Sequence, residues 1–76
     1  MKIGVPKEIK IKENRVGLVP GGVRQLVQEG NEVFIETNAG SGIGIDDEAY
    51  INVGAKILPD ASSIFTKSEM IIKVKE

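Results

Sequence analysis

The chain begins MKIGVPKEIKIKENRVGLVP, residues 1–20, and we expect the rest of the fold to be organised around this stretch. It predicts a short apolar strand over Lys2–Val5, which Pro6 ends because proline has no amide hydrogen to give to a sheet. A basic loop follows, in which Lys7, Lys10, Lys12 and Arg15 outnumber Glu8 and Glu13. Open α/β sheets bind ligands where such a loop would lie, at the carboxyl ends of their strands. The loop is therefore a candidate ligand site, although most charged runs are solvated surface.

Hydrophobic periodicity predicts three helices and three further strands after this loop. Val23, Leu26 and Val27 share one helical face, and Gly30 suits the left-handed position that follows a helix. Asp46 and Asp60 are expected to cap the second and third helices. The helices are expected at 20–30, 47–53 and 61–67, and the later strands at 32–36, 55–58 and 70–74.

This alternation predicts an α/β fold with a parallel four-stranded sheet and helices on both faces. Right-handed crossovers favour the strand order 2-1-3-4, with the switch point between the first and third strands. The first helix would then cover one face and the other two the opposite face. An exposed apolar face and an unpaired edge on the fourth strand follow, and we expect a homodimer or higher homo-oligomer. The candidate contributors to the exposed face are Val33, Ile35, Ile57, Ile71 and Val74.

The chain length, net charge and amino-acid composition restrict the possible functions. A chain of 76 residues is one domain at most and buries only roughly 60–65% of its unfolded surface. A net charge of −1 argues against nucleic acid as a partner, and the lack of histidine removes the commonest acid–base group and zinc ligand. The lack of cysteine fits a cytoplasmic protein. No apolar run approaches the ~20 residues that cross a membrane, so no membrane partner is expected. Without histidine, no metal site is expected either.

The segment Gly40–Gly44 could be mistaken for a dinucleotide-binding loop. It follows a strand and precedes a helix, as a dinucleotide loop does, but its spacing is G-x-G-x-G rather than G-x-G-x-x-G. Asp46 and Asp47 come next and would repel a pyrophosphate. We therefore expect no cofactor-binding residue here, and a tight structural turn instead.

Better candidates for ligand binding than the glycine-rich segment are two cationic residues, Arg15 and Lys75. Each follows a strand, so both belong to the carboxyl-end side of a parallel sheet. A guanidinium can hold a carboxylate through two parallel hydrogen bonds, and a nearby ammonium can stabilise charge on a carbonyl oxygen. The pair suits a small 2-oxo acid, although Lys75 alone could equally be an ordinary exposed lysine.

Four stretches cover the chain and carry a family resemblance. They read MKIGVPKEIK (1–10), ENRVGLVPGGV (13–23), AGSGIGIDDEAYINVGAKI (39–57) and MIIKVKE (70–76). Together they resemble the N-terminal domain shared by alanine dehydrogenases and the alpha subunits of proton-translocating nicotinamide nucleotide transhydrogenases. The KVKE block favours the dehydrogenases. The chain departs from the family pattern at Gly17 and Val19, and Val19 deprives the first helix of a capping hydroxyl.

The resemblance implies a parent enzyme that oxidises L-alanine to pyruvate and ammonium with NAD. Arg15 matches the residue that binds the substrate carboxylate, and Lys75 matches the catalytic, substrate-binding lysine beside the carbonyl or amino group of the substrate. Residues 1–76 would be an incomplete domain, the N-terminal part of a flavodoxin-like or Rossmann-like substrate domain. The NAD-binding domain and the catalytic histidine would lie beyond Glu76, so this chain alone is expected to be inactive. The alternatives are the same piece of a transhydrogenase, or a stand-alone binding or assembly module.

Overall fold

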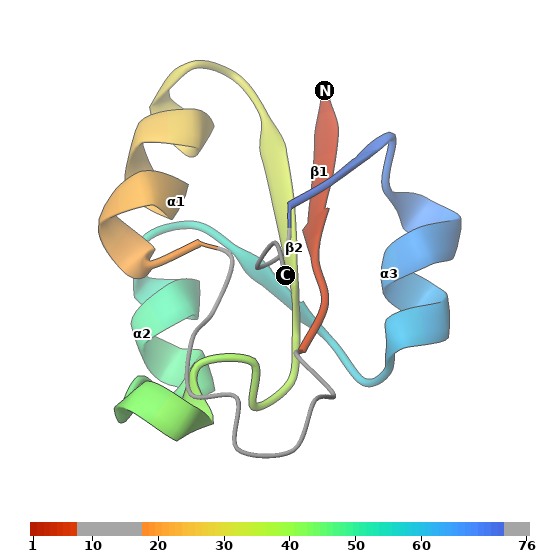
Figure 1. The fold of residues 1–76 in the computed structure, drawn as a ribbon. Helices are drawn as coiled ribbons and strands as arrows, with labels where there is room; N and C mark the ends of the chain where they lie inside the picture. The colour runs from red at the N-terminus through yellow and green to blue at the C-terminus, as the bar shows by residue number, and fades with distance from the viewer. Residues whose placement is uncertain (8–17, 73–76) are drawn as a thin grey trace.

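The computed structural model describes residues 1–7 and 18–72, which form a four-stranded sheet between two layers of helices (Figure 1). The elements alternate strictly along the chain, as the sequence predicts. The strands are β1 (Lys2–Val5), β2 (Glu32–Glu36), β3 (Lys56–Leu58) and β4 (Met70–Ile71). The helices are α1 (Pro20–Gln28), α2 (Asp47–Asn52) and α3 (Ala61–Lys67), with a short 3₁₀ turn, η1, over Ser41–Ile43. The parallel α/β class is therefore confirmed.

The order of the strands differs from the predicted one. All three pairings are parallel, and the order is β3-β2-β1-β4 rather than 2-1-3-4. The interior strands are β1 and β2, whose central residues are the most apolar of the sheet, whereas β3 begins with exposed Lys56 and lies at an edge. A strand that is apolar on both faces needs neighbours on both sides, and the predicted order had wrongly put β2 at an edge.

The observed order also changes which helices share a face. The chain steps in one direction from β1 to β2 to β3, so right-handed crossovers put α1 and α2 on the same face. The return from β3 to β4 runs the other way and puts α3 alone on the opposite face (Figure 1). The prediction of one helix on one face and two on the other is correct in number. It is wrong in assignment, because the lone helix is α3 and not α1.

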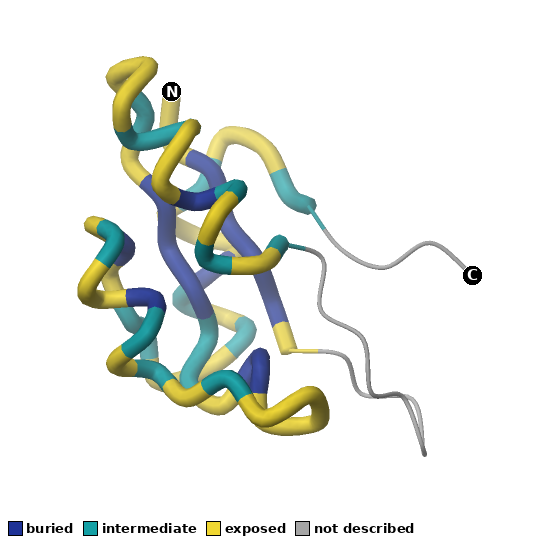
Figure 2. The backbone as a smooth tube through the Cα atoms, turned by 90° about the vertical axis from the view of Figure 1, so that its left-hand side faces the viewer, coloured by how far each residue is buried: buried dark blue, intermediate teal, exposed yellow. Residues whose placement is uncertain are grey.

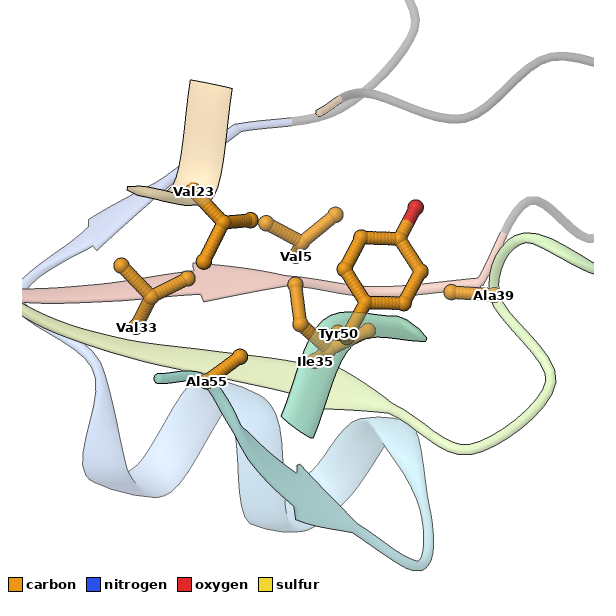
Figure 3. Packing of buried hydrophobic residues seen from close by; sticks show 7 residues of the cluster. All are labelled: Val5, Val23, Val33, Ile35, Ala39, Tyr50 and Ala55. Atoms are coloured by element: carbon orange, nitrogen blue, oxygen red, sulfur yellow. The ribbon is translucent and has the colours of Figure 1, made fainter. Parts of the chain in front are cut away.

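The main core lies between the sheet and the α1–α2 layer. In Figure 3 the side chains of Val5, Val33 and Ile35 rise from β1 and β2 toward Val23 of α1 and Tyr50 of α2. Each of these five is at most 1% exposed. Figure 2 shows the buried positions running through the central strands and the inner sides of the helices.

The predicted apolar surface therefore needs a correction. Val33 and Ile35 are buried under α1 and α2, because parallel strands in the interior of the sheet turn these positions toward that layer. Ile57 and Ile71 are half-buried, and Val74 lies outside the described residues. Among the described residues, the large exposed apolar side chains are Met1, Val19, Ile43, Ile51, Phe65 and Met70.

The α3 face depends on a glycine in β1. Ile64 of α3 is fully buried, and a Cβ added at Gly4 would sit 2.8 Å from its Cγ2 and 2.0 Å from Ser68 Oγ. The helix can therefore lie this close to the strand only because Gly4 has no side chain. The Oγ atom of Ser68 is buried and has no hydrogen-bond partner among the described residues.

The helix ends follow local chemistry, mostly as predicted. Asp46 accepts a hydrogen bond from the Ala49 amide at 3.0 Å, and Asp60 accepts one from the Ser63 amide at 2.7 Å. These bonds satisfy amides that the first helical turn leaves free. Val19 precedes α1 in an extended conformation and offers no side-chain cap, as its aliphatic side chain predicts. In the described part of the chain, no helix is long and apolar enough to cross a bilayer.

Candidate functional site

The carboxyl ends of the four parallel strands form one edge of the sheet, which we call the carboxyl-end rim. Among the described residues it comprises Lys7 after β1, Glu36 and Thr37 at the end of β2, Leu58 of β3 and Ile72 after β4. The strands β1 and β4 lie side by side on it, and the Ile72 amide donates to the Gly4 carbonyl at 2.9 Å. The switch point of the sheet is therefore between β1 and β4, and not between β1 and β3 as predicted. A switch point is where open α/β sheets place their ligands.

Arg15 and Lys75 themselves lie outside the described residues. Their positions in the chain are nevertheless informative, because Arg15 comes after β1 and Lys75 after β4. The predicted order would have put a third strand between β1 and β4, whereas the observed order makes these two strands neighbours.

The chain is held at the rim where it leaves β1. Pro6 is buried, and the amide of Lys7 donates to Glu36 Oε1 at 2.7 Å. Glu36 is the last residue of β2, so this bond ties the chain after β1 to the neighbouring strand. A hydrogen bond to a charged acceptor is shorter and stronger than a neutral one, which suits an anchor at an exposed rim.

A second anchor holds the chain where it approaches α1. The hydroxyl of Tyr50 donates to the Leu18 carbonyl at 2.8 Å, across 32 positions of sequence. The tyrosine is 0% exposed, and in Figure 3 its oxygen points away from the aliphatic side chains around its ring. Burial, with a smaller effect of the Asp47 charge, raises the pKa of Tyr50 above its ordinary value. The hydroxyl therefore keeps its proton and remains a donor.

Asp47 fixes the helix that carries Tyr50. Its carboxylate accepts from Thr37 Oγ1 at 2.6 Å and from the Asn38 amide at 2.8 Å. These bonds join the first turn of α2 to the end of β2, with Asn38 in the left-handed conformation at φ 65°. The position of Tyr50 is thus set by the sheet as well as by its own packing.

The glycine-rich turn between β2 and α2 is tight, as predicted. A Cβ at Gly40 would lie 2.9 Å from Ile45 Cβ and 3.1 Å from Tyr50 Cε2, so the turn packs directly on the tyrosine ring. Gly44 ends η1 in the left-handed conformation at φ 80°. The 3₁₀ turn itself was not predicted, because the loop has no hydrophobic periodicity that would indicate one.

An open groove of about 680 Å³ lies on the other side of the molecule, beside α3. It is lined by Phe34, Ile57, Leu58 and Thr66 together with the lysines Lys2, Lys56 and Lys67. Lys2 and Lys56 are the first residues of their strands and Leu58 is the last residue of β3, so the groove extends along the α3 side of the sheet. Lys56 also forms an ion pair with Glu32, with 3.7 Å between Nζ and Oε1. Across the described ranges, no cluster of three acidic side chains could hold a metal ion.

Sequence reasoning missed Tyr50 and Glu36. A signal for Tyr50 was present, because it is the single tyrosine and lies on the predicted second helix. A buried tyrosine hydroxyl almost always finds a partner, and its partner here is the backbone that enters α1. Glu36 gave no such signal, since an acidic residue at the end of a strand is common.

The structure defines the class of this protein, which is a small parallel α/β domain with its switch point at the carboxyl-end rim. Residues 4–76 match the family model described as alanine dehydrogenase/PNT, N-terminal domain, and the chain belongs to this family. The resemblance seen in the sequence is thereby confirmed.

Curated relatives agree with this assignment. The chain is 54% identical over 76 residues to an alanine dehydrogenase of Bacillus subtilis (strain 168) and 55% identical over 76 residues to one of Methanococcus maripaludis. Each match covers 100% of this chain but 20% of the relative. The chain thus corresponds to the N-terminal fifth of these relatives.

Solved structures show the same relationship. An L-alanine dehydrogenase superposes with a TM-score of 0.95 at 54% identity, over 100% of this chain and 21% of the other. A transhydrogenase from Sinorhizobium meliloti superposes with a TM-score of 0.88 at 30% identity, over 96% of this chain and 21% of the other. The fold is therefore common to both branches of the family, and the identity is higher with the dehydrogenase.

Proposed function

We propose that residues 1–76 form the N-terminal part of the substrate domain of an NAD-dependent alanine dehydrogenase. The parent enzyme would convert L-alanine, NAD and water to pyruvate, ammonium and NADH. The observation that carries the proposal is the match of the whole chain to alanine dehydrogenases at 54–55% identity. The adjacency of β1 and β4 supports it, because it brings the strands that precede Arg15 and Lys75 together at the switch point.

Each of the two cations has a separate task in this proposal. The guanidinium of Arg15 holds the substrate carboxylate through paired hydrogen bonds and so orients the molecule. The ammonium of Lys75 stabilises the negative charge that develops on the carbonyl oxygen of the 2-oxo acid. NAD, bound by a domain outside residues 1–76, supplies the hydride acceptor. The chain alone would therefore bind no cofactor and would be inactive.

The parent is further proposed to be cytoplasmic and a homo-oligomer. The alternative function is the corresponding piece of a transhydrogenase, which the structural match at 30% identity keeps open. The KVKE block at residues 73–76, which resembles the dehydrogenases, favours the first function.

A chimera tests the proposal directly. Residues 1–76 would replace the aligned segment of the Bacillus subtilis alanine dehydrogenase, since the alignment covers 100% of this chain. We expect the chimera to reduce pyruvate with ammonium and NADH, and residues 1–76 alone to show no turnover. A chimera that folds, as judged by circular dichroism and NADH binding, yet has no activity would contradict the proposal.

Arg15→Lys in the chimera tests the role of the guanidinium. Lysine keeps the charge but loses the planar fork, so the mutation should cost about 2–3 kcal/mol of transition-state stabilisation and lower kcat/KM for pyruvate accordingly. The KM for NADH should stay unchanged. The matched control is Arg24→Lys, since Arg24 lies exposed on α1. An Arg15 variant that behaves like this control would show that Arg15 is only a surface charge.

A further inference from the structure

We propose that the groove beside α3 binds a small phosphate monoester with an apolar or aromatic body. This site is independent of the function proposed above, because it uses neither Arg15 nor Lys75. Its volume of about 680 Å³ falls within the range of small-molecule sites, which is roughly 300–1,000 Å³. Its lining combines apolar side chains with three lysines and includes no acidic residue and no arginine.

The groove exists because α3 lies close to β1. Ile64 of α3 is fully buried, and the helix approaches Gly4 so closely that a Cβ there would lie 2.8 Å from Ile64 Cγ2. Of the described helices, α3 alone covers this face of the sheet (Figure 1). Since β3 is two strands away from β1, at the edge of the sheet, the space over β3 beside the helix stays open.

Apolar side chains form the floor of the groove. Phe34 of β2 belongs to its lining although only 6% of the residue is exposed, and Leu58 of β3 is half-buried. Side chains two positions apart on a strand point to the same face, so Leu58 shares a face with Lys56, which pairs in register with Phe34. A flat apolar body that lies on this strip would remove apolar surface from water, which favours binding.

The lysines give the groove its positive charge. They come from three elements, since Lys2 begins β1, Lys56 begins β3 and Lys67 ends α3. Two acidic side chains lie nearby, outside the lining. Glu32 forms the ion pair with Lys56, and Glu69 Oε1 accepts a hydrogen bond from the Lys2 amide at 2.7 Å. They offset part of the charge, but the lining itself offers a ligand only cationic and neutral groups.

Lysine rather than arginine favours phosphate as the anionic group. An arginine fork matches a carboxylate through two parallel hydrogen bonds, whereas lysine binds phosphate as a point charge. The second pKa of a phosphate monoester is about 6, so the group carries nearly two negative charges at neutral pH and can be shared by several ammonium groups. The hydroxyl of Thr66, also in the lining, adds a hydrogen-bonding group.

Phenyl phosphate is the probe, added to residues 1–76 in a heteronuclear NMR titration. We expect a Kd on the order of 1 mM, with the largest shifts at the amides of Lys56, Thr66 and Lys67. Inorganic phosphate and phenol should each bind at least about 5-fold more weakly, because each lacks one half of the contact. If inorganic phosphate binds as tightly as phenyl phosphate, the apolar floor plays no part and the proposal is overturned.

The double variant Lys56→Gln/Lys67→Gln tests the lysines. It should weaken the binding of phenyl phosphate at least about 5-fold. The matched control is Lys7→Gln/Arg24→Gln, which also removes two positive charges from exposed positions but outside the groove, and it should change the Kd less than about 2-fold. The dispersion of the NMR spectrum shows whether each variant is folded. Equal weakening by both pairs would mean that only net charge matters, and would overturn the site.

The chimera described above distinguishes a small ligand from a protein segment as the occupant. Saturation-transfer NMR should detect phenyl phosphate on the chimera, and Lys56→Gln/Lys67→Gln should reduce the signal. If this variant leaves the signal unchanged, the rest of the parent chain covers the groove and the proposal is overturned. Concentration-dependent shifts of the same amides of residues 1–76 without any probe would assign the groove to a second copy, with the same consequence. Turnover is not measured here, so an inactive chimera would count against the proposed function alone.

Discussion

Replacement of Gly4 by alanine should separate α3 from the sheet. The new Cβ would meet Ser68 Oγ at 2.0 Å, Ser68 Cβ at 2.8 Å and Ile64 Cγ2 at 2.8 Å, all below the closest approach of real Cβ atoms. Ile64 is fully buried and cannot turn away into solvent. Overpacking of this kind costs about 1–3 kcal/mol, and three simultaneous contacts put the expected loss at about 2–3 kcal/mol. For a domain of this size the thermal midpoint should fall by roughly 8–24 °C.

The single tyrosine of a chain without tryptophan makes the assay simple, because Tyr50 fluorescence reports on the core. Thermal unfolding would be followed by this signal and by circular dichroism. Ser68→Gly removes two of the three contacts and should restore most of the loss caused by Gly4→Ala. Gly21→Ala is the control, because no atom lies within 4 Å of its added Cβ, and it should not destabilise. A Gly4→Ala variant as stable as this control would refute the close packing of α3 on β1.

Three further predictions concern capping, pH and assembly. Val19→Thr should add the missing cap to α1 and raise the free energy of unfolding by about 1 kcal/mol, and an unchanged thermal midpoint would show that α1 needs no cap. Hydrogen bonds from the Ser63 backbone and side chain hold the pKa of Asp60 below its ordinary value of 3.8, so this carboxylate stabilises the fold above that pH and loses its effect as the pH falls through the lowered value. Asp60→Asn should therefore lose less stability than the parent between about pH 5 and pH 3, measured by urea unfolding, and equal losses would contradict this. Exposed Phe65 and Ile51 should make residues 1–76 self-associate at about 1 mM, and a light-scattering mass near 8.2 kDa would argue for a monomer.

Most of the local structure could be predicted from the sequence, for identifiable physical reasons. The third helix was predicted at its observed bounds, because Asp60 caps it and Pro59 ends the preceding strand. Gly30 and Gly54 adopt the left-handed conformation that ends a helix, at φ 94° and 102°. These features depend on one residue and its neighbours, so they can be read from the chain directly.

The strand order could not be read in the same way, because it depends on which strands meet in space. Helix faces and the exposed apolar positions followed from the order and shared its error. The composition of the strands held a usable signal, since Val33, Phe34 and Ile35 are apolar on both faces and β3 starts with Lys56. A strand of the first kind belongs inside a sheet and one of the second kind at an edge. For the site, a resemblance suggested Arg15 and Lys75, whereas the contact of Tyr50 with Leu18 joins residues 32 positions apart and required the structure.

The place of β1 in the sheet has a consequence for synthesis of the protein. Of the four described strands, β1 is synthesised first and lies in the interior of the sheet, and one of its two neighbours, β4, is made last. The β1–β2–β3 half can assemble as it emerges, with α1 and α2 already covering one face. Until Met70 and Ile71 are available, however, the outer edge of β1 exposes its free backbone groups to other nascent chains. Slow translation or a pause before β4 would lengthen this interval.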